Sequence, residues 1–167
     1  MASIILTGFM GAGKSTVAVL LGKQLNKPVI DLDAIITEDL QMPISEYFQL
    51  YGEAAFRKKE MEILQEMLRQ DAVIATGGGI ITMKENRKIL SQHPHVFYLK
   101  ADSDTLIQRI RQDQKNIRPL ATEKTESEIT ALFRARADFY EEGASHIIET
   151  IGKTPEAVVM EIIERMV

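Results

Sequence analysis

The sequence predicts an α/β fold of three layers, in which a central parallel sheet of five strands is flanked by helices. Short apolar runs alternate with longer amphipathic stretches along the chain, which is the order of βαβ units. The 167 residues suit one domain with one hydrophobic core. No internal repeat and no linker rich in proline, glycine or serine divides the chain, so we predict a single domain over residues 1–167.

The five strands are expected where short apolar runs end in polar residues or glycine. These runs are Ser3–Thr7, Val29–Asp31, Ala72–Thr76, Val96–Lys100 and His146–Glu149. Helices are expected over Lys14–Leu25, Ala34–Leu40, Ile44–Leu50, Glu53–Arg69, Met83–Gln92, Ser103–Gln112, Glu126–Glu141 and Pro155–Met166. The last of these has two start signals, because Thr154 suits the N-cap and Pro155 suits the first helical position.

Composition and charge exclude several classes of function. A formal net charge of −4 argues against a partner of nucleic acid, because phosphate binding usually requires a clustered basic excess. The absence of cysteine excludes disulfides, thiolate zinc sites and cysteine nucleophiles. No apolar run approaches the roughly 18 residues needed to span a bilayer, and the apolar N-terminus lacks a basic flank. We therefore expect a cytoplasmic protein without a membrane partner.

A glycine-rich segment follows the first predicted strand. It reads Gly-Phe-Met-Gly-Ala-Gly-Lys-Ser over residues 8–15 and matches the pattern G-x-x-x-x-G-K-[ST] between a strand and an amphipathic helix. Glycines let the backbone curl with its N–H groups inward, and the helix adds the positive end of its dipole. We expect Lys14 to reach the β- and γ-phosphates of a nucleotide, and the Ser15 hydroxyl to coordinate the bridging Mg²⁺.

Small-molecule kinases, hydrolytic motors and GTP-dependent switches all use such a loop. A switch would carry a guanine-reading N-K-x-D motif, but the Asn26-Lys27 pair is followed by Pro28 and Val29. A motor would normally be larger and end a strand in an acidic residue for the metal, whereas the third predicted strand ends in glycines 77–79. The rest of the chain thus favours a kinase.

Two aspartates follow the second predicted strand. Asp31 and Asp33 fall on the same side if the strand persists that far, and the carboxyl edge of a parallel sheet is where ligands bind. One carboxylate would hold the metal through water, and the other would accept a hydrogen bond from an acceptor hydroxyl. Because Asp33 immediately precedes a predicted helix, helix capping by Asp33 is the alternative.

Helical spacing places two arginines on inward faces. Arg57 continues the apolar stripe of its helix, with Glu60 near enough to orient the guanidinium, although a surface pair is the alternative. Arg136 shares a face with apolar residues, while Arg134 lies on the opposite face. Together with a glycine run at residues 77–79, whose alternative is a plain turn, inward arginines suit a carboxylate. The acceptor is therefore expected to be a carboxylic acid.

The segment from Asp113 to Thr125 is polar, lacks periodicity and is long for a loop without a function. We expect a mobile lid here. Arg118 within it would close over the β- and γ-phosphates and stabilise charge during transfer. A solvated loop arginine is the alternative.

These motifs together resemble the shikimate kinase family over nearly the entire chain. The resemblance is carried by Gly-Phe-Met-Gly-Ala-Gly-Lys-Ser-Thr at 8–16, Asp-Leu-Asp at 31–33, Phe-Arg-Lys-Lys-Glu at 56–60, Gly-Gly-Gly at 77–79, Arg-Pro-Leu at 118–120, and Arg136 ahead of Tyr140. It implies a P-loop fold like that of nucleoside monophosphate kinases, with a substrate-binding region at 33–61 and a mobile lid at 111–125.

The resemblance further implies transfer of the γ-phosphoryl group of ATP to the 3-hydroxyl of shikimate. The products would be shikimate 3-phosphate and ADP, made by a cytoplasmic monomer in the biosynthesis of aromatic amino acids through chorismate. Another small-metabolite kinase of the same fold, such as a gluconate kinase, is the alternative enzyme. An ATP-binding regulator without catalytic activity is the third reading.

Roles for individual residues also follow from the resemblance. The catalytic residues implied are Lys14, Asp33 and Arg118. Shikimate would be held by Asp33, Arg57, Gly78, Gly79 and Arg136. ATP would be held by Gly11, Ala12, Gly13, Lys14, Ser15, Thr16, Arg111, Arg118, Lys153 and Pro155, with Arg111 and Pro155 sandwiching adenine and Arg109 close enough to compete for that place. Mg²⁺ would be bound by Ser15 and, through water, by Asp31.

Overall fold

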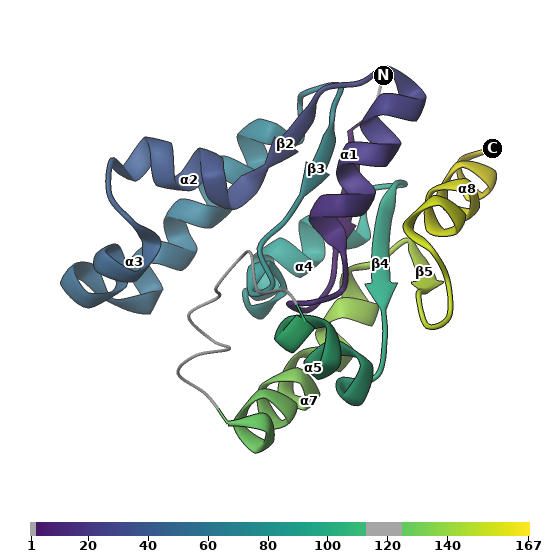
Figure 1. Ribbon diagram of the computed structural model, residues 1–167. Helices are drawn as coiled ribbons and strands as arrows, with labels where there is room; N and C mark the ends of the chain where they lie inside the picture. Colours follow the sequence, from purple (N-terminus) through teal and green to yellow (C-terminus); the bar gives the residue numbers. More distant parts are fainter. Residues whose placement is uncertain (1–2, 113–124) are drawn as a thin grey trace.

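The computed structural model describes residues 3–112 and 125–167, and it confirms the predicted three-layer α/β fold (Figure 1). The parallel sheet has the strand order β2-β3-β1-β4-β5. Its strands are β1 (Ile4–Thr7), β2 (Val29–Asp31), β3 (Val73–Ala75), β4 (Val96–Lys100) and β5 (His146–Glu149). The predicted lid residues 113–124, including Arg118, lie outside the described residues.

The strand order places β1 at the centre of the sheet, with β2 and β3 on one side and β4 and β5 on the other. The chain therefore crosses over β1 between β3 and β4. In an open parallel sheet, such a reversal leaves a crevice outside the carboxyl ends of the strands, where ligands bind. The glycine-rich loop after β1 and the glycine run after β3 both begin at this edge.

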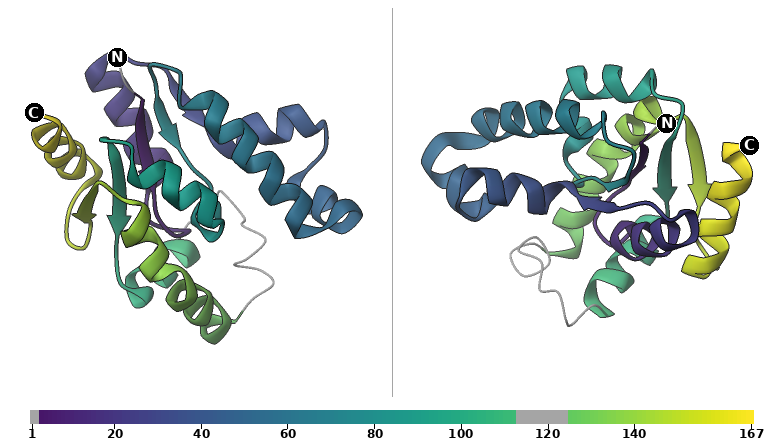
Figure 2. Two further views of the ribbon diagram at one scale, coloured as in Figure 1. Left: turned by 180° about the vertical axis from the view of Figure 1, so that it is seen from behind. Right: turned by 90° about the horizontal axis from the view of Figure 1, so that it is seen from above.

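Helices cover both faces of the sheet, as Figure 2 shows from above. On one face, α1 (Lys14–Leu25) packs beside α8 (Pro155–Met166). The other face carries α4 (Lys84–Ser91) and α7 (Glu126–Gly143), together with the short 3₁₀ helix η1 (Ile80–Thr82). α5 (Ser103–Gln112) packs against α7 and lies beside the loop that follows β1. In the described part of the chain, none of the helices has the length and apolarity to cross a membrane.

Two further helices project beyond the β2 edge of the sheet, α2 (Leu32–Leu40) and α3 (Ile44–Met67) (Figure 1). The sequence predicts two helices where α3 lies, and the backbone explains why. Gly52 has φ 86° and ψ 169°, which are not helical, so α3 consists of two helices joined at a kink. The second of these segments carries Arg57 and Glu60 toward the sheet edge.

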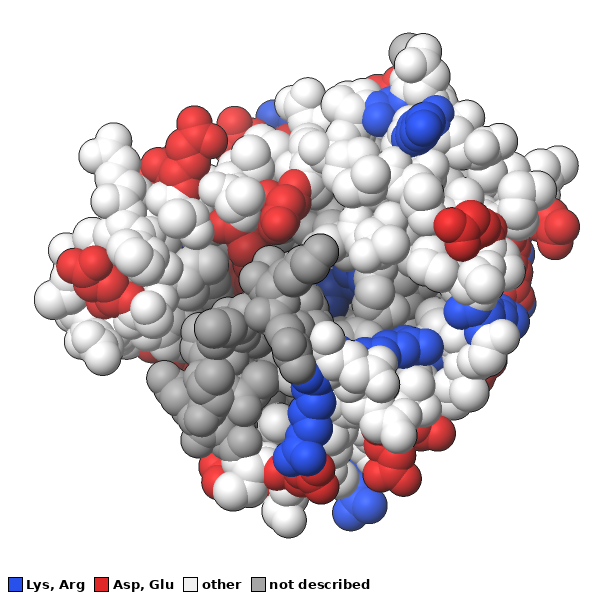
Figure 3. Space-filling model, in the orientation of Figure 1, with Lys and Arg blue, Asp and Glu red and all other residues white. Residues whose placement is uncertain are grey.

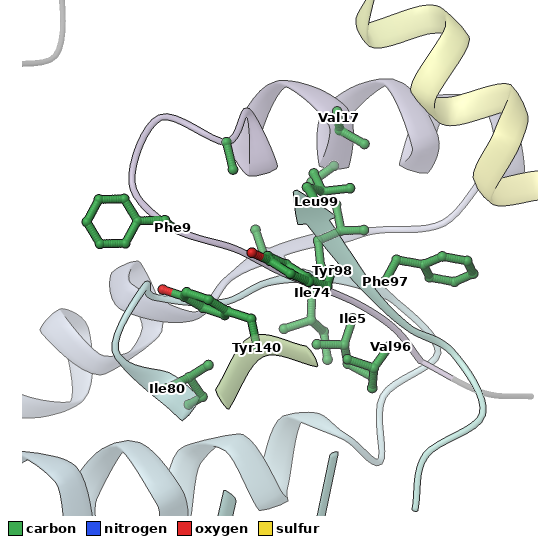
Figure 4. Packing of buried hydrophobic residues seen from close by; sticks show 14 of the residues in the cluster. Ile5, Phe9, Val17, Ile74, Ile80, Val96, Phe97, Tyr98, Leu99 and Tyr140 are labelled. Atoms are coloured by element: carbon green, nitrogen blue, oxygen red, sulfur yellow. The ribbon is translucent and has the colours of Figure 1, made fainter. Parts of the chain in front are cut away.

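The core is formed by the three central strands and the helix faces packed on them (Figure 4). All four residues of β1 are buried, as are all three of β3, because helices cover both sides of these strands. On the α7 side, the rings of Tyr98 and Tyr140 stack at a centroid distance of 5.1 Å and an interplanar angle of 18°. This stack joins β4 to α7.

The helix η1, which the sequence does not predict, is held to α4 and α7 by two side chains of α4. The Arg87 guanidinium donates through Nη1 to the carbonyls of Ile81 (2.8 Å) and Thr82 (3.1 Å). It also pairs with Glu142 and lies 4.0 Å from the centroid of the Phe139 ring. Asn86 Nδ2 donates to the Ile80 carbonyl at 3.0 Å. The backbone that follows the glycine run is thus anchored to two helices.

A hydrogen-bonded chain around His93 closes the opposite end of the sheet. His93 Nδ1 accepts from the backbone N–H of His95 at 3.1 Å, so this nitrogen carries no proton. Nε2 is then the protonated nitrogen and donates to Ser3 Oγ at 3.1 Å, and Ser3 Oγ donates to the Leu68 carbonyl at 3.2 Å. Burial, followed by the effect of His95, lowers the pKa of His93 from 6.5.

This chain predicts a loss of stability in mild acid. The unfolded state binds a proton at His93 near pH 6.5 and the folded state binds it only at lower pH, so the free energy of unfolding is fully retained above pH 6.5 and falls as the pH drops through the folded pKa. Urea unfolding as a function of pH should show the loss in the wild type and in His146→Gln. The same pH dependence in His93→Gln would contradict the assignment.

Candidate active site

The loop between β1 and α1 forms a cradle at the centre of the carboxyl edge. Gly11 and Gly13 have φ angles of 86° and 92°, in the left-handed region that favours glycine. A Cβ at Gly11 would also lie 2.9 Å from the Leu106 carbonyl oxygen, so the loop packs too closely for a side chain there. α1 begins immediately after Gly13, and its N-terminal dipole supplies positive potential at the cradle.

Lys14 lies at the first position of α1, half-buried against the loop. Its ammonium donates to the carbonyls of Gly8 at 2.5 Å and Phe9 at 3.2 Å. The side chains of Ser15 and Thr16 on the same turn are exposed. A cation and two exposed hydroxyls therefore lie in the first turn of α1, whose N-terminus has no side-chain cap, and this combination suits a polyphosphate.

A cavity of about 210 Å³ opens beside the loop, between α1, α5 and the turn before α8. Arg109 on α5 forms one wall, and it donates through Nη1 to Thr150 Oγ1 (3.1 Å) and through Nη2 to the Thr150 carbonyl (3.3 Å). The cavity is lined by Ala12, Gly13, Thr16, Val17, Arg109, Thr150, Lys153, Pro155 and Val158. Predicted nucleotide-binding residues from both ends of the chain thus meet here.

Arg111 lies elsewhere. Its side chain is 65% exposed and pairs with Glu126 of α7 at 2.7 Å, so Arg109 is the arginine that shares the cavity with Pro155. The difference is one of helical phase: residues two apart on α5 point about 200° apart around the axis, and only one of them can face the cavity. Sequence alone leaves this phase open by one or two residues.

The structure corrects the predicted geometry of the two aspartates. β2 ends at Asp31 and α2 begins at Leu32, so Asp33 lies in the first turn of a helix and does not share a strand face with Asp31. Asp31, not Asp33, caps α2: its Oδ1 accepts from the N–H groups of Asp33 (3.1 Å) and Ala34 (3.3 Å). The capping alternative considered for Asp33 therefore belongs to Asp31.

Asp33 is directed across the edge to the glycine run after β3. A Cβ built on Gly77 would lie 2.6 Å from Asp33 Oδ1, so the carboxylate packs directly against the backbone of that residue. Asp33 is also near enough to influence the titration of Glu60 on α3. The aspartate after β2 and the glycines after β3 thus form one wall of the site.

The donor set for a metal consists of oxygen atoms, which are the ligands that Mg²⁺ prefers. Ser15 offers an exposed hydroxyl, and in Asp31 a single carboxylate oxygen accepts both cap bonds. Within the described ranges 3–112 and 125–167, no three histidine, cysteine or acidic side chains cluster as a metal cage. These residues fit a metal that arrives on nucleotide phosphates, because Mg²⁺ is usually bound by one or two protein oxygens plus phosphate and water.

Arg57 forms a buried ion pair with Glu60. Nη1 donates to Glu60 Oε1 at 2.8 Å, and the two side chains are only 11% and 1% exposed. This confirms that Arg57 points inward and excludes the surface-pair alternative. Burial raises the pKa of the Glu60 carboxyl, an effect that the charge of Arg57 opposes. The bond from Nη1 to Glu60 thus holds the buried guanidinium in place.

Aromatic rings complete the surroundings of Arg57. Its guanidinium carbon lies 5.2 Å from the centroid of Phe56 and 5.9 Å from that of Phe48, within range of a cation–π attraction. A Cβ on Gly79 would lie 2.6 Å from Arg57 Nη1, so only glycine at this position lets the guanidinium approach the backbone. The contribution of Phe48 is not apparent from the sequence, since Phe48 lies before the Gly52 kink.

Arg136 approaches the same glycine run from α7. A Cβ on Gly78 would lie 3.8 Å from Arg136 Nη1 and 3.6 Å from the Tyr140 hydroxyl. Arg134 is exposed and lines a different cavity, between α5 and α7, as its position on the opposite helix face predicts. Asp33, Arg57, Arg136 and residues 77–79 thus converge beside the phosphate loop. On the face seen in Figure 3, acidic side chains predominate over α2 and α3, whereas basic and acidic side chains are mixed over the rest of the described surface.

A phosphate cradle beside a cluster of two arginines and one aspartate defines a P-loop kinase for a small anionic acceptor. Comparison with known proteins narrows this class. The family model described as Shikimate kinase matches residues 10–167. The shikimate kinase of Enterococcus faecalis is 44% identical over 99% of each chain.

Solved structures agree. A shikimate kinase from Acinetobacter baumannii, in complex with shikimate, is 34% identical, with a TM-score of 0.88 over 99% of this chain and 93% of that one. The Bacteroides thetaiotaomicron enzyme is 32% identical, with a TM-score of 0.88 over 98% and 97% of the two chains. The chain belongs to the shikimate kinase family, and it is an ATP-dependent kinase.

The ion pair yields a prediction about stability. Glu60→Gln leaves the buried Arg57 cation with only the exposed Glu53 as a counter-charge, and we expect it to lower the free energy of unfolding by about 3 kcal/mol. Glu53→Gln is the matched control, because Glu53 is 64% exposed and lies 3.5 Å from Arg57 Nε. Loss of this surface pair should cost about 0.5 kcal/mol or less. Equal effects of the two substitutions in urea unfolding would contradict the difference in burial.

Proposed function

We propose that this chain transfers the γ-phosphoryl group of ATP to the 3-hydroxyl of shikimate, giving shikimate 3-phosphate and ADP. The observation that supports this most directly is the meeting of a phosphate loop with Arg57, Arg136 and a glycine run at one sheet edge. Shikimate carries a carboxylate for the arginines and hydroxyls for the aspartate. The shikimate-bound relative, similar in fold over nearly the whole chain, supports the same acceptor.

On the nucleotide side, the roles proposed are electrostatic. The N–H groups of the loop from Gly11 to Thr16 and the α1 dipole hold the phosphates, and Lys14 neutralises the charge on the transferred group. Arg109 and Pro155 form the walls for the base, with Lys153 at the rim. The roles proposed for Arg111 and Arg118 rest on the family resemblance alone, because Arg111 pairs with Glu126 in this structure and Arg118 lies outside the described residues.

We propose Ser15 and, through water, Asp31 as the protein's ligands for Mg²⁺, which supplies charge neutralisation between the β- and γ-phosphates when bound. Asp31 has a structural duty as well, because its carboxylate caps α2. That cap fixes where α2 starts, and so fixes the position of Asp33 two residues later.

On the acceptor side, residues 33–61 would form most of the binding region. Asp33 accepts a hydrogen bond from the reacting hydroxyl and orients its oxygen for in-line attack. Arg57 and Arg136 bind the carboxylate, since a planar guanidinium matches a carboxylate with two parallel hydrogen bonds. The backbone at Gly78 and Gly79 contacts the ring of the acceptor where no side chain intervenes. Little covalent work is left for the protein, because phosphoryl transfer depends on positioning and charge.

The acceptor is tested by measuring ADP release with ATP and Mg²⁺ over shikimate, gluconate, nucleoside monophosphates and dephospho-coenzyme A. We expect turnover with shikimate and none above background with the others, because shikimate carries on one ring a carboxylate for Arg57 and Arg136 and a hydroxyl for Asp33. Turnover solely with another acceptor would overturn the proposal. ATP binding without stimulation by any acceptor would support a regulator instead.

Asp33→Asn should reduce kcat about 100-fold or more, because the amide removes the charge that orients the hydroxyl. Affinity for ATP should be unchanged, since the phosphate loop and the Arg109 cavity remain intact. Asp39→Asn is the control: Asp39 lies on the same helix but pairs with Lys59 at 2.8 Å on the surface. Near-normal turnover of Asp33→Asn with shikimate would refute the role assigned to Asp33.

A further inference from the structure

We infer that Tyr140 is a positioning residue: its hydroxyl fixes the orientation of the Gly78–Gly79 peptide and thereby shapes the acceptor side of the site. This inference rests on the proposed function, because the glycine run is taken as part of the acceptor pocket. The Tyr140 hydroxyl donates to the Gly78 carbonyl at 2.5 Å across 62 residues of sequence. The residue is fully buried on α7, so water does not compete for this bond.

Local structure does not determine the middle peptide of the glycine run. The Gly77 carbonyl accepts from Ile80 N–H at 3.2 Å, and the Gly79 carbonyl accepts from Thr82 N–H (3.1 Å) and Thr82 Oγ1 (2.8 Å). Both partners lie three residues further along the same turn. The Gly78 carbonyl instead finds its partner on another helix. Its peptide is also flanked by two residues without Cβ, whose φ and ψ angles are the least restricted of any residue type.

The orientation of this peptide decides what the pocket presents. A trans peptide is planar, so its N–H and C=O groups point in opposite directions. With the Gly78 oxygen directed to Tyr140, the Gly79 N–H is directed away from α7. Rotation of the peptide would turn a carbonyl oxygen toward that side, and a carbonyl oxygen repels a carboxylate or competes for Arg57, which packs against Gly79.

Tyr140 also sits beside the second arginine of the pocket. It lies one helical turn after Arg136, and a Cβ on Gly78 would be within 3.6 Å of the Tyr140 hydroxyl and 3.8 Å of Arg136 Nη1. Burial raises the pKa of Tyr140 well above its usual value of 10, and the opposing effect of Arg136 is smaller. The hydroxyl therefore keeps its proton and acts as the donor to Gly78 next to a guanidinium.

The ring itself is held by the core. Tyr98 stacks on it at 5.1 Å, and Figure 4 shows the two rings nearly parallel with their hydroxyls directed to the same side. A stacked, buried ring has few alternative rotamers, so the hydroxyl is in place before a ligand binds. Tyr98 is the matched control. It is buried like Tyr140, with 1% of its surface exposed, and its ring belongs to the same stack, but the hydrogen bond to Gly78 comes from Tyr140.

The experiment compares Tyr140→Phe with Tyr98→Phe, since each removes one buried hydroxyl and preserves the stacked rings. For Tyr140→Phe we expect the KM for shikimate to rise by up to about tenfold, because the lost hydrogen bond no longer favours the orientation of the Gly78–Gly79 peptide that binds shikimate over the rotated one. The KM for ATP should stay within about twofold, because no nucleotide contact changes. Tyr98→Phe should leave both KM values near those of the wild type.

The outcomes separate the inference from the function on which it rests. A wild-type protein that does not phosphorylate shikimate would refute the proposed function. Normal wild-type turnover, with an unchanged KM for shikimate in Tyr140→Phe or equal changes in both variants, would overturn the role of Tyr140. If Tyr140→Phe has a lower Tm, the affinity of the folded variant for shikimate, measured by calorimetry at about 10 °C, distinguishes a positioning role from a structural one. A purely structural role predicts a lower Tm with wild-type affinity.

Discussion

Parallel pairing of β1 with β3 in one register is the constraint on which the rest of the structure depends. Leu6 pairs with Ala75, and Thr76 then donates to the Leu6 carbonyl through both its N–H (3.1 Å) and its hydroxyl (2.9 Å). Because Thr76 is buried, a slip of one residue would leave its polar groups without partners. The register therefore starts the phosphate loop and the glycine run side by side, with a Cβ on Gly78 only 3.8 Å from the Gly8 carbonyl oxygen.

That register brings several charged side chains to one edge of the sheet, and the protein provides partners for the cations among them. Arg57 is buried but keeps Glu60 as a counter-ion, and Lys14 is held by two loop carbonyls. Each cation is thus solvated by the protein before a ligand binds, which limits the reorganisation that binding requires. The positive end of α1 adds to the same field. An anionic acceptor and a nucleotide phosphate therefore meet in a site that is already arranged for negative charge.

The predicted elements agree with the structure closely because their signals are local. Apolar runs, the Thr154 cap with Pro155, and the break at Gly52 are each contained within a few residues. Local sequence patterns did not predict the geometry where one residue belongs to two elements. Asp31 ends β2 and also caps α2, and the sequence does not show which aspartate makes the cap bond. The sequence likewise does not show which of Arg109 and Arg111 faces the cavity beside Pro155, because that depends on a helical phase that the packing against Thr150 determines.

The sequence by itself determined the phosphate loop, the strand and helix order, and the inward faces of Arg57 and Arg136, since glycine spacing and helical periodicity are properties of short segments. Only the tertiary structure decided which segments meet. The contact of Gly79 with Arg57, the stacking of Phe48 near that guanidinium, and the bond from Tyr140 to Gly78 join residues brought together by strand order and helix packing. Such contacts leave no periodic trace in a single sequence, because each depends on the register of two elements at once.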